Sequence, residues 1–104
     1  MLLKDKVVIV SGIGPGLGQE LSTLAAKEGA KAVVLAARTA AKLDVAEQEI
    51  NALGLGTAVL KVVTDISDQA QCQALADRAV AEFGRIDVLF NSAYDPGSFE
   101  PIES

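Results

Sequence analysis

VVIVSGIGPGLG, residues 7–18, joins an apolar run to a glycine-rich segment, and this stretch decides the fold. The run Val7–Val10 has no polar alternation, as expected of a parallel strand that is covered on both faces. Four glycines follow within residues 12–18, and an amphipathic segment comes after them. Glycines let phosphate groups approach the backbone, and the start of a helix adds unpaired N–H groups and a positive dipole end. This order favours a phosphate-binding turn over the alternative, a glycine-rich turn without a ligand.

Outward from this stretch, short apolar runs alternate with longer segments of helical periodicity. The runs predict four parallel strands, at Val7–Val10, Ala32–Ala37, Ala58–Val63 and Ile86–Phe90. Apolar residues at offsets of three, four and seven predict three helices, at about Gly16–Glu28, Ala40–Leu53 and Asp68–Phe83. This spacing places Leu17, Leu21, Leu24 and Ala25 on one stripe of the first helix, and Leu43, Ala46, Ile50 and Leu53 on one stripe of the second. Gly29, Gly54 and Gly84 predict the helix ends, and Asp68 with Gln71 predicts a capped start for the third helix. The chain therefore predicts an α/β fold in the order β-α-β-α-β-α-β, with right-handed crossovers.

The composition excludes several classes of function. The 104 residues carry a net charge of −5, which disfavours nucleic acid and anionic membranes as partners. The chain has no histidine and a single cysteine, Cys72, so we expect neither an internal disulfide nor a metal site. No apolar run reaches the length of a membrane span or of a signal-peptide core. We therefore expect a cytoplasmic protein that forms one domain at most, or part of one.

The glycine spacing distinguishes between the known phosphate-binding loops. A Walker loop needs Lys and then Ser or Thr after its second glycine, whereas Leu17 and Gly18 follow Gly16. The common dinucleotide pattern G-x-G-x-x-G fails as well, because Leu17 occupies its last glycine position when it is read from Gly12. The spacing that fits is G-x-x-x-G-x-G, with glycines at 12, 16 and 18.

With these residues the chain resembles the short-chain dehydrogenase/reductase family over residues 5–93. Four linked features carry the resemblance, namely Ser11-Gly12-x-x-x-Gly16-x-Gly18, Ala36-Ala37-Arg38, Asp65 and Asn91-Ser92-Ala93. The resemblance implies a Rossmann-type parallel sheet with flanking helices and the strand order 3-2-1-4, incomplete at its C-terminal end. It also implies an NAD(P)-binding half-domain at residues 1–93 and a loop at 94–104 that leads toward an absent C-terminal half.

The resemblance further implies which residues contact the dinucleotide. They are Ser11, Gly12, Gly14, Pro15, Gly16, Leu17, Gly18, Arg38, Thr39, Asp65, Ile66, Asn91, Ser92 and Ala93. Ala37 stands where NAD-preferring relatives tend to carry Asp, and Arg38 offers a planar fork suited to a 2′-phosphate, with the Thr39 hydroxyl beside it. We therefore expect NADP(H) to be preferred. NAD(H) remains possible, with the Arg38 guanidinium stacked on the adenine ring. The alternative without a ligand is that Arg38 is a solvent-exposed charge at the end of a strand.

Two of these positions have specific implied roles. The Asp65 carboxylate is implied to accept a hydrogen bond from the adenine amino group, with the Ile66 amide completing adenine recognition. The alternative is that Asp65 caps the third helix, a role for which Asp68 competes. The stretch Asn91-Ser92-Ala93 is implied to lie along the cofactor riboses, although Tyr94 replaces a glycine of the family and leaves the path of this loop open.

No catalytic residue is assigned. The family's proton donor is a tyrosine in a Tyr-x-x-x-Lys pair, but here the single tyrosine, Tyr94, is followed four residues on by Ser98. We expect the cofactor-binding part of an NADP(H)-dependent oxidoreductase, which would act on a carbonyl or alcohol substrate once a C-terminal half completes it.

Other interpretations remain beside this one. A non-catalytic dinucleotide-binding module would have the same site without hydride chemistry. A methyltransferase needs an acid near Ala37, and a phospho-acceptor regulator needs acids near Ser11, so both are disfavoured. The apolar fourth run should leave an unpaired strand edge, which would allow self-association.

Overall fold

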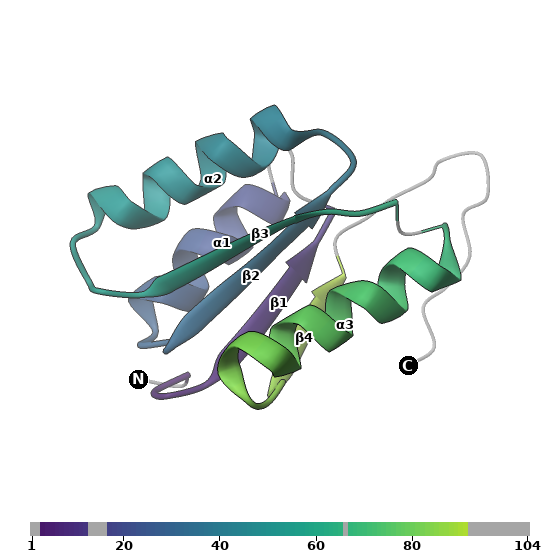
Figure 1. Ribbon diagram of the computed structural model, residues 1–104. Helices are drawn as coiled ribbons and strands as arrows, with labels where there is room; N and C mark the ends of the chain where they lie inside the picture. Colours follow the sequence, from purple (N-terminus) through teal and green to yellow (C-terminus); the bar gives the residue numbers. More distant parts are fainter. Residues whose placement is uncertain (1–2, 13–16, 66, 92–104) are drawn as a thin grey trace.

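A four-stranded parallel sheet with helices on both faces organises the chain (Figure 1). The computed structural model describes residues 3–12, 17–65 and 67–91, with the backbone alone at 17–19 and 91. The elements in chain order are β1 (Val7–Ser11), α1 (Leu17–Lys27), β2 (Ala32–Ala37), α2 (Ala40–Ala52), β3 (Ala58–Val63), α3 (Gln69–Phe83) and β4 (Val88–Asn91). The strands lie in the order β3-β2-β1-β4, which confirms the expected topology.

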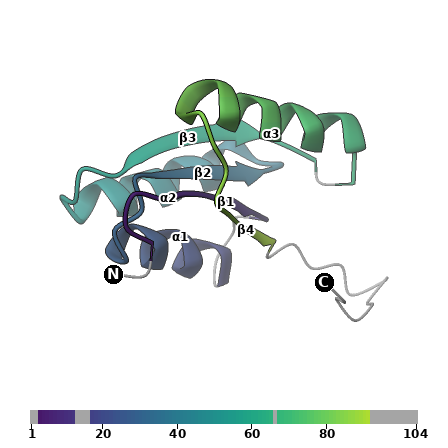
Figure 2. The same cartoon turned by 90° about the horizontal axis from the view of Figure 1, so that it is seen from below.

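The helices form two layers, with α1 and α2 against one face of the sheet and α3 against the other (Figure 2). Side chains of β1 alternate between these layers, so Val8 and Val10 join the core under α1 and α2, whereas Val7 and Ile9 pack against α3. The chain builds outward from β1 to β3 and then returns to the other side of β1. Because each crossover is right-handed, this reversal places α3 on the opposite face.

The four apolar runs differ in how far they are buried. Every residue of β1 and β2 is buried, as the sequence predicts for strands covered on both faces. For β3 and β4 that prediction is wrong, since Val63 is 57% exposed and Leu89 is 61% exposed. These two strands form the outer edges of the sheet, and α3 covers only part of the face that Leu89 occupies. The residue types of a run predict a strand, but the position of the strand in the sheet decides its burial.

The contact face of α1 is made mostly of small residues, with Leu21 packed beside them. Ser22, Ala25 and Ala26 are buried against the sheet, whereas Leu24 is half exposed, contrary to the predicted stripe. Small side chains allow a helix to lie close to the strands, and this turns the flanking leucine toward solvent. In α2 the prediction is confirmed, because Leu43, Ala46 and Ile50 are all buried.

Glycines end the helices as the sequence predicts. Gly84 is the C-cap of α3 in the left-handed region, with φ of 82°, and its N–H donates to the Val80 carbonyl at 2.7 Å. Gly29 and Gly54 also have positive φ after α1 and α2. The last strand begins at Val88, two residues later than predicted, because Ile86 and Asp87 belong to the loop that connects α3 to β4.

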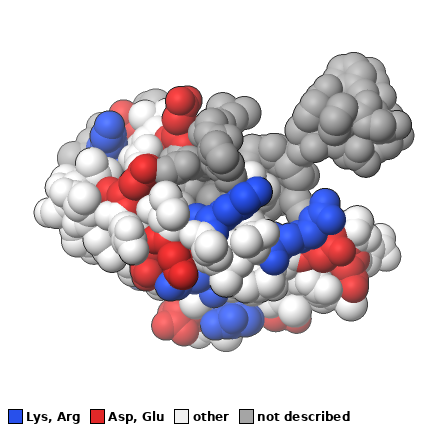
Figure 3. Space-filling view, turned by 90° about the horizontal axis from the view of Figure 1, so that it is seen from above, with Lys and Arg blue, Asp and Glu red and all other residues white. Residues whose placement is uncertain are grey.

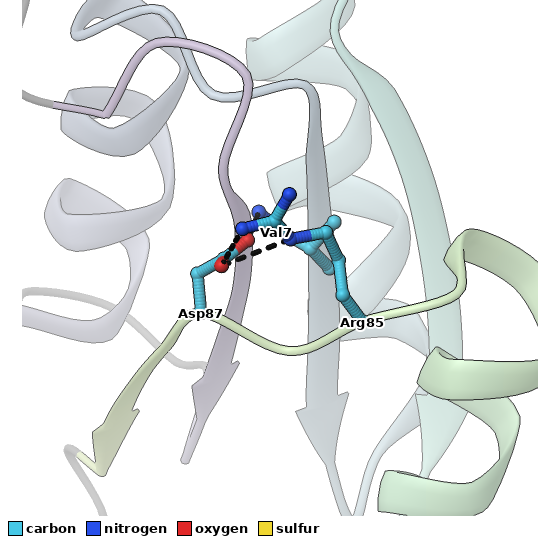
Figure 4. Close-up of polar contacts among 3 residues, drawn as sticks. All are labelled: Val7, Arg85 and Asp87. Atoms are coloured by element: carbon cyan, nitrogen blue, oxygen red, sulfur yellow. Dashed lines mark hydrogen bonds and ion pairs between the residues drawn. The ribbon is translucent and has the colours of Figure 1, made fainter.

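A polar cluster at the amino end of the sheet attaches β4 to β1 (Figure 4). The Val7 N–H donates to Asp87 Oδ2 at 2.8 Å, and the Asp87 N–H donates to the Val7 carbonyl at 2.9 Å. Arg85 donates from Nε at 3.0 Å and from Nη2 at 2.6 Å to Asp87 Oδ1. The register that follows pairs Val8 with Val88. Asp87 therefore satisfies the first N–H of β1 and fixes where β4 begins.

Among the residues that the structure describes, no helix combines the length and the apolar character that crossing a membrane requires.

Candidate functional site

Polar residues gather at the carboxyl edge of the sheet, where three neighbouring strands end. Ser11 ends β1, Arg38 and Thr39 follow β2, and Asp65 lies two residues beyond the end of β3. Register places Ser11 between Ala36 of β2 and Asn91 of β4. In open α/β sheets this edge, beside the central strand where the chain reverses, is the general place for ligands. The fold therefore brings four sequence-predicted side chains, those of Ser11, Arg38, Thr39 and Asp65, to one edge.

The residue that follows β1 has a backbone conformation and a lack of side chain that would let a phosphate group approach the main chain closely. Gly12 has φ of 80°, a left-handed conformation that favours glycine, and its N–H donates to the Ala36 carbonyl at 2.9 Å. Ser11 is buried, at 3% exposure, so its hydroxyl lies inside the strand end. The predicted residues Gly14, Pro15 and Gly16 lie outside the described residues. Leu17 and Gly18 are the first two residues of α1.

The end of β2 leads into a helix start that carries positive charge. Thr39 is the N-cap of α2, with φ of −113° and ψ of 118°, but its side chain makes no capping hydrogen bond. No acidic residue lies in the first turn of α2, whereas Lys42 does. Arg38 is exposed and forms no ion pair with any described residue. The helix dipole and these two cations create a positive potential at the end of β2.

The Asp65 carboxylate is held in the loop between β3 and α3. Its Oδ1 accepts hydrogen bonds from the Ser67 N–H at 3.0 Å and from the Ser67 hydroxyl at 2.6 Å. The Ser67 hydroxyl first, then its N–H and the charge of Arg38, hold the pKa of Asp65 below its ordinary value of 3.8. Asp65 is therefore an anion at neutral pH, close enough to Arg38 for the two charges to interact.

The alternative role of Asp65 as a helix cap is wrong. Asp68 is the N-cap of α3, and its Oδ1 accepts from the N–H groups of Ala70 at 2.9 Å and Gln71 at 3.2 Å. Since the helix start is satisfied by Asp68, the Asp65 side chain serves only its own turn with Ser67. This outcome removes the competing explanation for Asp65 and leaves its ligand-binding role as a prediction.

Gln71 belongs to this edge, although the sequence indicated it only as a capping partner. Its Nε2 donates to Asp68 Oδ2 at 3.3 Å, and its Oε1 accepts from the Asp65 N–H at 2.7 Å. The spacing predicted that Gln71 pairs with Asp68, but the reciprocal capping bond is not formed, because the Asp68 N–H donates to the Asp65 carbonyl at 3.0 Å. No sequence signal indicated the contact with the Asp65 N–H, because it depends on how the loop folds back over the helix start.

The remaining predicted positions carry less structural information. The Asn91 backbone lies in β4 beside Ser11, while Ile66, Ser92 and Ala93 lie outside the described residues. Within the described ranges, no three histidine, cysteine or acidic side chains come together as metal ligands would. On the face seen in Figure 3, positive and negative side chains are interspersed.

Comparison with known proteins identifies relatives of this arrangement. A family profile described as short chain dehydrogenase matches residues 6–100. Levodione reductase from Leifsonia aquatica is 36% identical over 100 residues, covering 96% of this chain and 37% of the relative. Among solved structures, a metagenomic short-chain oxidoreductase in complex with NADP has a TM-score of 0.76 at 34% identity, covering 86% of this chain and 39% of that one.

A second structural neighbour also has a cofactor in its description. Actinorhodin polyketide ketoreductase with NADPH, as an F189W variant, has a TM-score of 0.78 at 28% identity, covering 88% of this chain and 34% of that one. The chain spans between a third and two-fifths of the length of these relatives. The match lies where the sheet, the glycine turn and the polar carboxyl edge are found.

Proposed function

Because this chain belongs to the short-chain dehydrogenase family, we propose that it is the NADP(H)-binding part of an oxidoreductase. When bound, the nicotinamide would exchange a hydride with a carbonyl or alcohol carbon. The residues that would hold the dinucleotide are Ser11, Gly12, Gly14, Pro15, Gly16, Leu17, Gly18, Arg38, Thr39, Asp65, Ile66, Asn91, Ser92 and Ala93. They comprise a glycine turn, a cationic strand end and an anionic loop, the groups that a phosphorylated dinucleotide requires.

The observation that carries the proposal is the exposed Arg38 without an ion-pair partner among the described residues. A guanidinium matches a phosphate through two parallel hydrogen bonds. Ala37, buried at the end of β2, supplies no carboxylate that would repel a 2′-phosphate. The start of α2 adds a dipole and Lys42. These features support a preference for NADP(H), as do two structural neighbours whose descriptions name NADP or NADPH.

The other parts of the cofactor have matching groups along the same edge. Gly12 has no side chain to obstruct a pyrophosphate, and its left-handed turn leads toward the start of α1. The Asp65 carboxylate would accept from the adenine amino group, and the Ile66 amide would lie beside it. Asn91, Ser92 and Ala93 would line the riboses. The acidic and basic groups would thus contact two different groups of the adenosine half, Asp65 the adenine amino group and Arg38 the 2′-phosphate.

The catalytic acid is not assigned to any of these 104 residues, which contain no Tyr-x-x-x-Lys pair. We propose that the hydride chemistry needs a further part, comparable to the length by which the relatives exceed this chain. The substrate would then be a small carbonyl or alcohol compound. A non-catalytic dinucleotide-binding module is the second candidate, and the missing tyrosine pair is the observation that favours it.

Calorimetric titration of the 104-residue chain with NADPH and, separately, with NADH tests this function. We expect micromolar binding of NADPH and weaker binding of NADH. No heat with either cofactor, from a chain that circular dichroism shows to be folded, would contradict the proposal. Equal affinities would contradict only the preference. The 104 residues alone should not oxidise NADPH under either candidate, because they contain no Tyr-x-x-x-Lys pair. A Tyr-x-x-x-Lys pair in any sequence that continues beyond residue 104, together with NADPH oxidation by that longer chain in the presence of aldehydes or ketones, would decide for the enzyme over the binding module.

Two accompanying proposals concern the protein's surroundings. Among the described strands β4 pairs only with β1, and Leu89 is largely exposed, so we propose that a second copy associates along β4. Analytical ultracentrifugation of the parent chain and of Leu89→Lys tests this, since only the parent should dimerise.

We also propose a cytoplasmic location, because a chain with one cysteine needs no oxidising compartment, and cell fractionation would check it.

A further inference from the structure

The loop between β3 and α3 is closed by one side chain, that of Gln71. Its carboxamide accepts from the Asp65 N–H at 2.7 Å and donates to Asp68 Oδ2 at 3.3 Å. It therefore connects Asp65, the second residue after β3, to the N-cap of the helix. In the ordinary capping box the equivalent side chain accepts from the N–H of the N-cap residue itself. Here the Asp68 N–H donates to the Asp65 carbonyl at 3.0 Å, and the Gln71 acceptor goes to Asp65 instead.

The consequence concerns the orientation of the Asp65 carboxylate. Its Oδ1 accepts both hydrogen bonds from Ser67. Its Oδ2 accepts no hydrogen bond from any residue that the structure describes. The backbone of Asp65 is held by Gln71, and the preceding Thr64 N–H donates to the Ala37 carbonyl at 2.8 Å. Together these bonds fix where the carboxylate lies relative to the end of β2.

We infer that Gln71 is a positioning residue, which acts through Asp65 to hold its carboxylate in place for the adenine amino group. The inference rests on the proposed cofactor function. Gln71 itself would touch no part of the cofactor. Its effect would come from restricting an exposed loop, since each lost anchor increases the number of conformations from which the ligand must select.

A purely local role for Gln71 would have a different signature. If its carboxamide served only the start of α3, its removal would lower the stability of the helix and leave the adenine preference unchanged. If it positions Asp65, removal must change the recognition of one chemical group on the ligand. The test therefore compares two ligands that differ only at that group.

The probe is NADPH against its hypoxanthine analogue, in which a carbonyl oxygen replaces the adenine amino group. The analogue presents an acceptor to the Asp65 carboxylate, so the parent chain should prefer NADPH by roughly 10- to 100-fold, the range for a hydrogen bond to a charged group. Asp65→Ala should abolish this preference. Gln71→Ala should reduce it by roughly three- to tenfold, as for residues coupled through one network.

Gln73→Ala is the matched control on the same helix. Its carboxamide donates to Asp77 one turn further along, at 3.0 Å, and has no contact with the loop. This variant should keep the full preference of the parent. In a chain that already carries Asp65→Ala, Gln71→Ala should have no further effect on the preference, because the group through which it acts is gone.

A measurement without ligand separates the inference from the proposed function. In the parent, the Ser67 donors hold the pKa of Asp65 below its ordinary value. Titration of the Asp65 carboxyl carbon by NMR should find that pKa closer to 3.8 in Gln71→Ala and unchanged in Gln73→Ala. An unchanged pKa in both variants would overturn the inference.

The remaining outcomes each contradict a different statement. If Asp65→Ala abolishes the preference but Gln71→Ala keeps it in full, the positioning role is wrong and the adenine contact stands. If Gln73→Ala loses as much as Gln71→Ala, the effect is general to the helix and the inference is also wrong. If the parent binds NADPH and its analogue equally, the adenine contact itself fails, and the inference about Gln71 fails with it.

Discussion

Each edge of the sheet carries an arginine and an aspartate, but the two pairs are arranged differently. At the amino edge Arg85 and Asp87 form a direct ion pair of 2.6 Å, and Asp87 also binds the Val7 N–H. At the carboxyl edge Arg38 and Asp65 interact only through their charges, and neither forms an ion pair with a described residue. The amino-edge pair is satisfied within the protein. The carboxyl-edge pair keeps unused hydrogen-bonding capacity, which the proposed cofactor site requires.

This difference teaches how to separate structural from ligand-binding charges. Both arginines follow the end of an element, and both aspartates have a lowered pKa. What distinguishes them is the identity of the donors. One donor to Asp87, the Val7 N–H, comes from another strand and ties β4 to β1, whereas both donors to Asp65 come from its own turn. Changes at the two edges should therefore affect different properties.

The largest expected effect is that of Arg38→Ala on cofactor affinity. Loss of a charge-assisted hydrogen bond should weaken NADPH binding by about 1–3 kcal/mol, roughly 5- to 150-fold, and leave NADH binding nearly unchanged. Stability should stay within about 0.5 kcal/mol, as for other exposed substitutions. Calorimetry and urea unfolding measure the two properties. Equal losses for NADPH and NADH would mean that Arg38 does not contact the 2′-phosphate.

Asp87→Ala should have the opposite pair of effects, a lower stability and an unchanged affinity for NADPH. It removes the acceptor of the Val7 N–H at the start of a fully buried strand, so the urea midpoint should fall clearly. The affinity of the folded molecules for NADPH should not change, because the site lies at the other edge. Asp87→Asn keeps an acceptor for Val7 without the charge and should lie between the parent and Asp87→Ala. An affinity loss that matches that of Arg38→Ala would contradict the separation of the two edges.

A smaller effect is expected on the pH dependence of stability. The Val7 N–H first, and then Arg85, hold the pKa of Asp87 below its ordinary value of 3.8. A carboxyl with a lower pKa in the folded state stabilises the fold above the unfolded pKa and loses this contribution as pH falls through the folded pKa. Unfolding midpoints measured from pH 5 to pH 2 should therefore decline below about 3.8, and less steeply in Asp87→Asn. An identical slope in the variant would contradict the assignment to Asp87.

The smallest effect should be that of Arg85→Ala. The Arg85 side chain is 55% exposed, so its ion pair is screened by water and contributes little to stability. We expect a barely measurable shift of the urea midpoint at low salt, which disappears at high salt. A loss as large as that of Asp87→Ala would show that the arginine, and not the Val7 contact, fixes this edge.

Local patterns in the sequence were sufficient for much of the fold. The order of seven elements, the glycine C-cap of α3 and the N-cap at Asp68 are all confirmed. These features depend on residues close together in the chain, where periodicity and capping preferences act directly. The strand order came from the family resemblance, which rests on the glycine spacing and the residues that follow each strand. The same reasoning located Arg38 and Asp65 at the carboxyl edge.

The tertiary structure alone decided the burial of similar strands and the partners of polar groups. Residues 58–63 and 32–37 are comparable apolar runs, yet only the inner strand is buried on both faces, because burial depends on the neighbours in the sheet. Asp87 had no sequence signal for its contact with Val7, which is 80 residues away. Likewise, the capping pattern predicted that Gln71 contacts Asp68, but the fold of the loop added Asp65. Sequence patterns record short-range preferences, whereas contacts between distant segments depend on the assembled sheet.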